Sequence, residues 1–210
     1  MDAAAPAIRR AEAADLPAAA DTLAAAFADY PWTRWVVDPD DHRERLRGLY
    51  AIYLRVALEL GQLWVSDDVA AVAAWTSSRA GAQQEELFER EGLVAEIARL
   101  SGSRVSNVLA GIEALAPHAP EGDHWVLAAV GVRPERQGAG LGTRVLAPAL
   151  AGFDLDGELA VLDTSSPENV RLYERLGFRT TAEVQMPDGG PRVWLMRREP
   201  RPLGGAAPLG

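Results

Sequence analysis

The chain has 210 residues and a formal net charge of −9 at neutral pH, with 48% hydrophobic and 24% charged residues. This composition is typical of one folded, soluble domain and not of a disordered segment. Cysteine and lysine are both missing from the sequence, which excludes disulfides, thiolate metal sites, a cysteine acyl-enzyme and a lysine Schiff base. The acidic balance disfavours nucleic acid and anionic membranes as partners.

Metal binding, membrane insertion and export are also disfavoured by the sequence. The three histidines, His42, His118 and His124, do not show the spacing of metal ligands. The longest apolar runs are about seven residues, whereas a membrane-spanning helix needs roughly 20. The first ten residues lack the basic and apolar regions of a secretion signal. We therefore expect a cytoplasmic protein that binds neither metal nor membrane.

In the first half of the chain, the apolar spacing predicts an alternation of strands and helices. We expect a strand over 7–11, helices over 16–28 and 41–60, strands over 62–66 and 69–75, and helical structure over 82–116 with a break at 101–103. Asp15 is placed to cap the first helix, Pro31 to break the chain after it, and Gly61 to end the second helix. Asp67 and Asp68 would form the turn of a hairpin.

In the second half, strands and helices alternate more regularly. We expect a buried strand over 124–132, a helix over 140–152, a strand over 159–163, a helix from Ser166 and Pro167 to Gly177, and a hairpin of strands 178–186 and 192–197. The strand, helix, strand order implies a parallel strand pair joined by a right-handed crossover. A single domain would then span 1–198, with a flexible tail over 199–210.

The strongest local pattern is three alternating glycines, Gly138, Gly140 and Gly142, directly after the buried strand 124–132. Glycines let successive N–H groups converge, and the N-terminus of a helix adds partial positive charge, so the segment is suited to a pyrophosphate. A dinucleotide fingerprint would need glycine in place of Thr143, and a P-loop would need lysine. A turn that only packs a helix onto a sheet is the structural alternative.

A second pattern follows the next expected strand. Asn169 precedes Leu172-Tyr173 and Gly177-Phe178. Together with Gln137-x-x-Gly140-x-Gly142, this segment resembles the GNAT acetyltransferase superfamily. The resemblance implies the α/β (α+β) GNAT fold, a mixed, mostly antiparallel sheet with a splayed parallel strand pair and flanking helices. It also implies acetyl-CoA as co-substrate and a small-molecule primary amine as acceptor. Because the chain has no cysteine, we expect direct transfer in a ternary complex without an acyl-enzyme.

The resemblance extends over nearly the whole chain to the members of that superfamily that acetylate puromycin. The segments that carry it are 22–31, 37–40, 75–76, 100–104, 115–118 and 173–178. It implies an aminonucleoside acceptor and a role in antibiotic resistance. Trp32 and Trp35 depart from the pattern in the expected acceptor region. The alternatives are a GNAT enzyme for another small amine or a peptide N-terminus, and an acyl-CoA-binding sensor without turnover.

The resemblance assigns cofactor-binding roles to residues around the glycines. The backbone of Val130 and Val132 would bind the pantetheine arm of acetyl-CoA, with ordinary sheet pairing as the alternative. Asn169 would bond the pantetheine amides, with a helix cap as the alternative. The residues expected around the pyrophosphate are Gln137, Gly138, Gly140, Gly142 and Thr143.

The resemblance also implies the catalytic and acceptor residues. Tyr173 would be the general acid, because a phenol with a pKa of about 10 is protonated at neutral pH and can donate to the departing CoA thiolate. Its alternative is a packing role. The base stays open between Asp163, His124 and a water chain, and both side chains could instead be structural. Tyr30 and Trp75 are expected to line the acceptor pocket, with core packing as the alternative.

Overall fold

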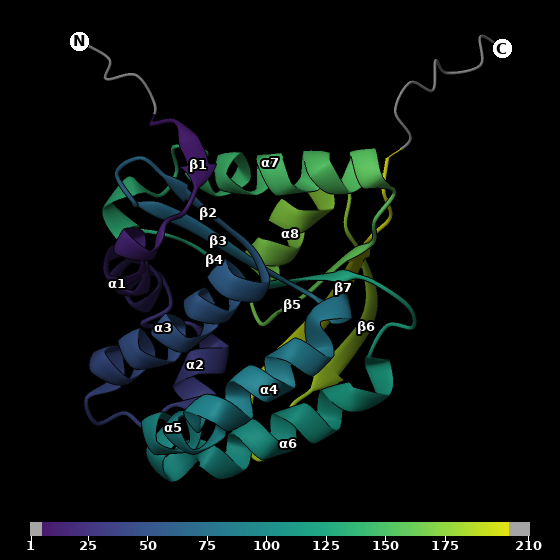
Figure 1. The fold of residues 1–210 in the computed structure, drawn as a ribbon. Helices are drawn as coiled ribbons and strands as arrows, with labels where there is room; N and C mark the ends of the chain where they lie inside the picture. Colours follow the sequence, from purple (N-terminus) through teal and green to yellow (C-terminus); the bar gives the residue numbers. More distant parts are fainter. Residues whose placement is uncertain (1–5, 202–210) are drawn as a thin grey trace, which may run out of the picture.

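The computed structural model describes residues 6–201, which form a seven-stranded sheet with helices on both faces (Figure 1). The sheet order is β1-β2-β3-β4-β5-β7-β6, and only β4 and β5 pair in parallel. The strands are β1 (Ile8–Arg10), β2 (Gly61–Ser66), β3 (Ala71–Ser77), β4 (Trp125–Val132), β5 (Ala160–Thr164), β6 (Arg179–Gln185) and β7 (Arg192–Arg198). The helices are α1 (Leu16–Ala26), α2 (Pro31–Val36), α3 (His42–Leu60), α4 (Gly81–Glu91), α5 (Leu93–Ser101), α6 (Val105–Leu115), α7 (Leu141–Asp156) and α8 (Pro167–Arg175). The mixed, mostly antiparallel sheet with one parallel pair confirms the expected architecture.

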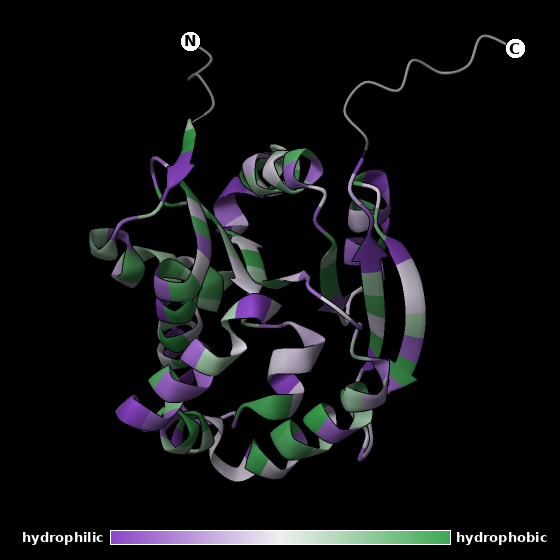
Figure 2. Cartoon of the chain, turned by 45° about the vertical axis from the view of Figure 1, so that its right-hand side comes forward, coloured by the Kyte–Doolittle hydropathy of each residue, from purple (hydrophilic) through white to green (hydrophobic). Residues whose placement is uncertain are grey.

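Two hydrophobic cores lie on opposite faces of the sheet. Side chains alternate along a strand, so Val72 and Ala74 of β3 face the core under α1 and α3, whereas Ala73 and Trp75 face the core under α7 and α8. The outer helices are amphipathic and carry both hydrophobic and hydrophilic residues along their length (Figure 2). The central strands are consequently buried on both faces.

A helical excursion over residues 78–124 connects β3 to β4, although these strands are antiparallel neighbours. It contains α4, α5 and α6 and lies at the bottom of the view in Figure 1. Two polar anchors fix it to the segment around α2. The backbone N–H and the hydroxyl of Ser103 both donate to the carboxylate of Asp38, and the side chain of Asn107 donates to the carbonyl of Trp35 at 2.7 Å. The excursion therefore adds a wall to the face of the sheet that α1–α3 cover.

The helix that carries the second sequence pattern, α8, forms as expected. The Ser166 hydroxyl caps α8 by accepting from the backbone N–H of Asn169 at 3.3 Å, and Pro167 is the first helical residue. Gly177 follows the helix with a φ of +94°. The final hairpin and the strand, helix, strand order from β4 to β5 are confirmed as well.

Several expected boundaries were wrong. Pro31 does not merely break the chain but starts α2, because proline is well suited to a first helical turn. Asp15 does not cap α1; its carboxylate accepts from Arg9 at 2.7 and 2.9 Å and from the Glu12 N–H at 2.8 Å. Gly92 adds a second break within 82–116. In α7 the helix passes through Gly152 and ends at Gly157.

The described part of the expected tail is bonded to the domain. The backbone N–H of Arg201 donates to the carboxylate of Asp154 at 2.7 Å. The rest of the predicted tail, 202–210, lies outside the described residues. Among residues 6–201, no helix is long and apolar enough to span a bilayer. Those same residues do not bring together three histidine or acidic side chains that could hold a metal ion.

Candidate active site

The parallel strands β4 and β5 separate shortly after they begin. Only Trp125 and Val126 of β4 pair with β5, opposite Ala160 and Val161. On its other edge β4 carries a bulge at Ala128, because Ala129 pairs with Ala74 and Leu127 with Trp75. From Leu127 onward, the edge of β4 that faces β5 lies outside the ladder. Its N–H and C=O groups can therefore pair with an extended amide chain.

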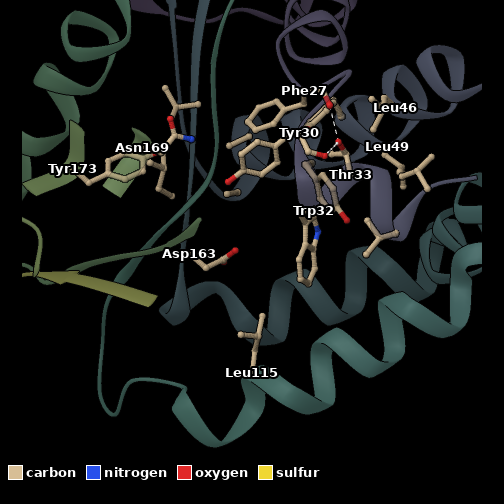
Figure 3. Close-up of a pocket in the computed structure, with 18 residues that line it drawn as sticks. Phe27, Tyr30, Trp32, Thr33, Leu46, Leu49, Leu115, Asp163, Asn169 and Tyr173 are labelled. Carbon is tan, nitrogen blue, oxygen red and sulfur yellow. Dashed lines mark hydrogen bonds between the residues drawn. The ribbon is translucent and has the colours of Figure 1, made fainter. Parts of the chain in front are cut away.

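A cavity of about 240 Å³ fills the gap between the two strands (Figure 3). Its walls come from both faces of the sheet, since α1–α3 contribute aromatic and aliphatic side chains and α8 contributes Asn169 and Tyr173. We call it the reaction cavity; its lining residues are Phe27, Tyr30, Trp32, Thr33, Val36, Val37, Leu46, Leu49, Tyr50, Tyr53, Leu115, Leu127, Ala128, Ala129, Val130, Asp163, Asn169 and Tyr173. Two reactants that approach from opposite faces can meet there.

An aromatic wall covers the α1–α3 side of the reaction cavity. The ring of Phe27 meets Tyr30 edge-on at 5.0 Å and stacks on Tyr50 at 5.2 Å. The Tyr30 hydroxyl lies 2.7 Å from the Thr164 hydroxyl and accepts from the Ser165 N–H at 2.7 Å. These bonds fix the wall to the end of β5 and hold Tyr30 in the lining of this cavity.

Trp75, which we expected to line the acceptor pocket, lies elsewhere in the structure. Trp75 is fully buried and meets Phe153 edge-on at 5.0 Å in the core under α7, so the structure does not bring it to the reaction cavity. Trp35 is also buried in a core, whereas Trp32 lines the cavity and donates its backbone N–H to the Ser165 hydroxyl at 3.1 Å.

Sequence reasoning missed two lining tyrosines on α3. Tyr50 and Tyr53 face the cavity together with Leu46 and Leu49. Residues three or four positions apart share one face of a helix, so the spacing 46, 49, 50 and 53 was the available signal.

Tyr173 is buried and lies in the reaction cavity beside Asn169, four residues earlier on α8. Burial raises the pKa of the Tyr173 phenol well above its ordinary value, and the neighbouring Tyr30 and Asp163 raise it further. The phenol therefore keeps its proton at neutral pH. Because Ser166 is the cap of α8, the side chain of Asn169 is not needed for capping and can face the cavity.

The two candidate bases lie in different places. The Asp163 carboxyl group at the end of β5 points into the reaction cavity (Figure 3). It has contact with the open space of the cavity, but protein surrounds it on the other sides, and this desolvation raises its pKa above the usual value. His124 lies outside this cavity, with Nδ1 2.8 Å from the Gly122 carbonyl oxygen.

The glycine loop (137–143) joins β4 to α7. Gly138 and Gly140 have φ values of +80° and +73°, a conformation that disfavours other residues. The Gln137 amide donates to the Val132 carbonyl at 3.0 Å and holds the loop at the end of β4. The first bond of α7 runs from the Arg144 N–H to the Gly140 carbonyl at 3.1 Å. The N–H groups of the preceding residues 141–143 therefore point out of the helix toward any bound anion.

The chain is similar to known acetyltransferases in sequence and in structure. Residues 89–180 match a family model described as "Acetyltransferase (GNAT) domain". The chain has the GNAT fold. The fold matches the expectation from the glycine loop and the α8 segment. The family-model match supports an acetyl-transferring enzyme that uses acetyl-CoA as co-substrate.

Solved GNAT structures resemble nearly the whole chain. A Corynebacterium glutamicum protein described as "histone acetyltransferase HPA2 and related acetyltransferase" is 24% identical with a TM-score of 0.68, and the match covers 97% of this chain and 99% of that one. The Drosophila melanogaster polyamine N-acetyltransferase is 17% identical with a TM-score of 0.59, covering 91% and 98%. Arylalkylamine N-acetyltransferase 2 from Aedes aegypti is 15% identical with a TM-score of 0.58, covering 92% and 98%.

Proposed function

We propose that the chain transfers the acetyl group of acetyl-CoA to the primary amine of a small molecule, and that this acceptor is puromycin or a similar aminonucleoside. The observation that carries the proposal is the reaction cavity, which passes through the gap between β4 and β5 and is lined from both faces of the sheet. Transfer between two substrates needs such a meeting point, whereas a sensor that only binds acyl-CoA does not.

The cofactor side of the site would be built mainly from backbone groups. The glycine loop, with Gln137, Gly138, Gly140, Gly142 and Thr143, would hold the pyrophosphate. The edge of β4 that faces β5, at the backbone of Val130 and Val132, and the side chain of Asn169 would bind the amides of the pantetheine arm. The Val132 carbonyl already accepts from Gln137, which leaves its N–H, within residues 6–201, as the free group at that position. The thioester would then end near Tyr173 in the reaction cavity.

The proposed reaction is a direct acyl transfer. The amine nitrogen attacks the thioester carbonyl carbon, a C–N bond forms, and the C–S bond breaks. The departing sulfur takes a proton from the Tyr173 hydroxyl, which its raised pKa keeps available. The nitrogen loses its proton to Asp163 or to water in the cavity. The placement of Asp163 in the reaction cavity favours it over His124 for this contact.

The nature of the reaction cavity and the resemblances support a small amine as the acceptor. Aromatic rings of Phe27, Tyr30 and Tyr50 offer flat apolar faces, which suit a nucleoside with an aromatic aminoacyl group. The Drosophila and Aedes proteins are named for small amines, polyamines and arylalkylamines. If puromycin is the acceptor, acetylation of its amine would give resistance to the drug.

A panel of amines that includes puromycin tests this proposal, with CoA release and product mass as readouts. We expect CoA release to depend on the amine, acetylated puromycin as a product, and survival of expressing cells on the drug. Turnover of other amines but none on millimolar puromycin would reject this acceptor alone. Tight binding of acetyl-CoA with no release of CoA on any amine would reject transfer and favour a sensor.

A further inference from the structure

A second cavity adjoins the reaction cavity. It has a volume of about 510 Å³ and lies between the end of α6 and the strands β5, β6 and β7. Leu115 and Asp163 line both cavities. The two spaces therefore meet at Leu115 and at the carboxyl group of Asp163.

The walls of the second cavity are largely apolar. Val161 and Leu195 form its floor on the sheet, and Ile112 and Leu115 contribute from α6. The side chains of Leu162 and Met196, which also border it, belong to the core on the other face of the sheet. Its polar lining residues besides Asp163 are His118, His124, Thr181 and Arg197. Ile112 is 63% exposed and lies at the rim of the cavity. Among the described residues that line this cavity, Asp163 alone carries a carboxyl group.

The helical excursion (78–124) creates this cavity. Antiparallel neighbours such as β3 and β4 can be joined by a two-residue turn, yet here three helices intervene. The end of the excursion supplies Leu115 and Ala116 to the cavity wall and returns to β4 at His124, which also lines it. The excursion thus places an apolar wall beside Asp163.

We infer that the acceptor is a primary amine with an apolar arm, whose ammonium group lies at Asp163 and whose arm occupies the second cavity. The inference rests on the proposed acetyl transfer and specifies its substrate class. The reaction cavity alone, at about 240 Å³, lies below the range of about 300–1,000 Å³ that small-molecule sites usually have. Both cavities together accommodate a larger acceptor, and apolar walls favour an aryl or alkyl arm.

Straight-chain primary amines from butylamine to decylamine test the inference, with kcat/KM measured from CoA release at saturating acetyl-CoA. Each methylene that enters an apolar cavity should raise kcat/KM by about fourfold until the chain reaches the end of the cavity. Ala116→Phe should fill the space and reduce the decylamine-to-butylamine ratio to about one. Ala95→Phe, an exposed position on α5 of the same excursion, should keep the native ratio. Ile112→Asn changes an exposed side chain at the rim and should lower the ratio in a protein that still folds.

The possible outcomes separate this inference from the proposed function. If butylamine is acetylated but kcat/KM does not rise with chain length, the inference of an apolar arm is wrong and acetyl transfer still stands. If kcat/KM rises with chain length but neither Ala116→Phe nor Ile112→Asn changes that rise, the arm binds outside the second cavity. This result would also overturn the inference. No CoA release with any amine, despite bound acetyl-CoA, would overturn acetyl transfer and the inference with it.

Discussion

We propose that residues 125–178 bind the cofactor (the cofactor half) and that residues 16–60 and 78–124 bind the acceptor (the acceptor half). These two halves are built in different ways. The cofactor half uses backbone features, namely the unpaired edge of β4, the left-handed glycines of the loop and the N-terminus of α7. The acceptor half uses side chains from α1–α3 and α6, which are far apart in sequence. A site made of backbone has a short linear signature, whereas a pocket of scattered side chains does not.

The largest effect we expect is on the cofactor half, from Tyr173→Phe. This change keeps the buried ring and removes only the proton donor, so kcat should fall by about 10²–10⁴-fold. Acetyl-CoA affinity by calorimetry and the circular dichroism spectrum should stay close to native. If the Tyr173→Phe variant keeps the native kcat at pH 7, Tyr173 is not the general acid and has only a packing role. In the native enzyme the raised pKa of the phenol predicts that loss of this proton lowers kcat only well above pH 10.

Gly140→Asp should weaken acetyl-CoA binding by about 100-fold, equivalent to ~2.7 kcal/mol. The substitution places a carboxylate where phosphates would approach and strains a backbone with a φ of +73°. Gly157→Asp is the matched control, because Gly157 has a φ of +71° at the other end of α7. Both variants should lose stability, but only the first should lose affinity in calorimetry. Equal affinity in the two variants would contradict the phosphate assignment of the loop.

Asp163→Asn tests the junction between the two halves. Loss of the carboxylate should lower kcat/KM for the amine by about tenfold, with acetyl-CoA affinity maintained. This is less than the roughly 10²–10⁴-fold typical of a general base, because water in the cavity can take the proton in its place. The raised pKa also predicts the sign of the stability change. The folded state holds the proton to a higher pH than the unfolded chain, so ionisation destabilises the native protein as pH rises from about 4 through the raised pKa.

The variant should therefore melt at a higher temperature than the native protein at pH 7, with a smaller difference at pH 4. Asp156→Asn, an exposed position on α7, is the control and should show neither effect. A lower melting temperature at pH 7 in Asp163→Asn would indicate that the carboxylate holds the fold together and would contradict its role in the cavity.

The smallest effect is expected in the acceptor half, from Tyr30→Phe. The variant loses the hydroxyl that contacts Thr164 and Ser165 at 2.7 Å, and each lost bond costs about 1 kcal/mol. The melting temperature should fall, and KM for the amine should rise about threefold as the wall loosens, an effect of under 1 kcal/mol. Steady-state kinetics would contradict this placement if KM for acetyl-CoA rose and KM for the amine did not.

The same contrast explains what the sequence could predict. In the cofactor half, local rules decide the structure. Ser166 and Pro167 start α8 and the alternating glycines form the turn after β4, so the strand order, the loop and the placement of Asn169 and Tyr173 could all be foreseen. These features depend on capping, backbone conformation and helix spacing, which are visible in a short stretch of residues.

Outside the cofactor half, tertiary contacts decide the structure. Trp75 lies on β3 next to the cavity-facing strand, yet side chains alternate along a strand and its own side points to Phe153. Asp15 has the sequence position of a cap, but an ion pair with Arg9 takes its carboxylate. The second cavity depends on how α6 returns to β4, which no local pattern specifies.

Hydrogen exchange of the full chain with and without CoA tests the central claim most directly. If the gap between β4 and β5 and the glycine loop hold the cofactor, CoA should slow exchange in peptides that cover 127–132 and 137–143. Peptides of the helical excursion (78–124) should exchange at the same rate in both samples. Protection that appears in the excursion and is missing from β4 and the loop would contradict the division of the molecule into a cofactor half and an acceptor half.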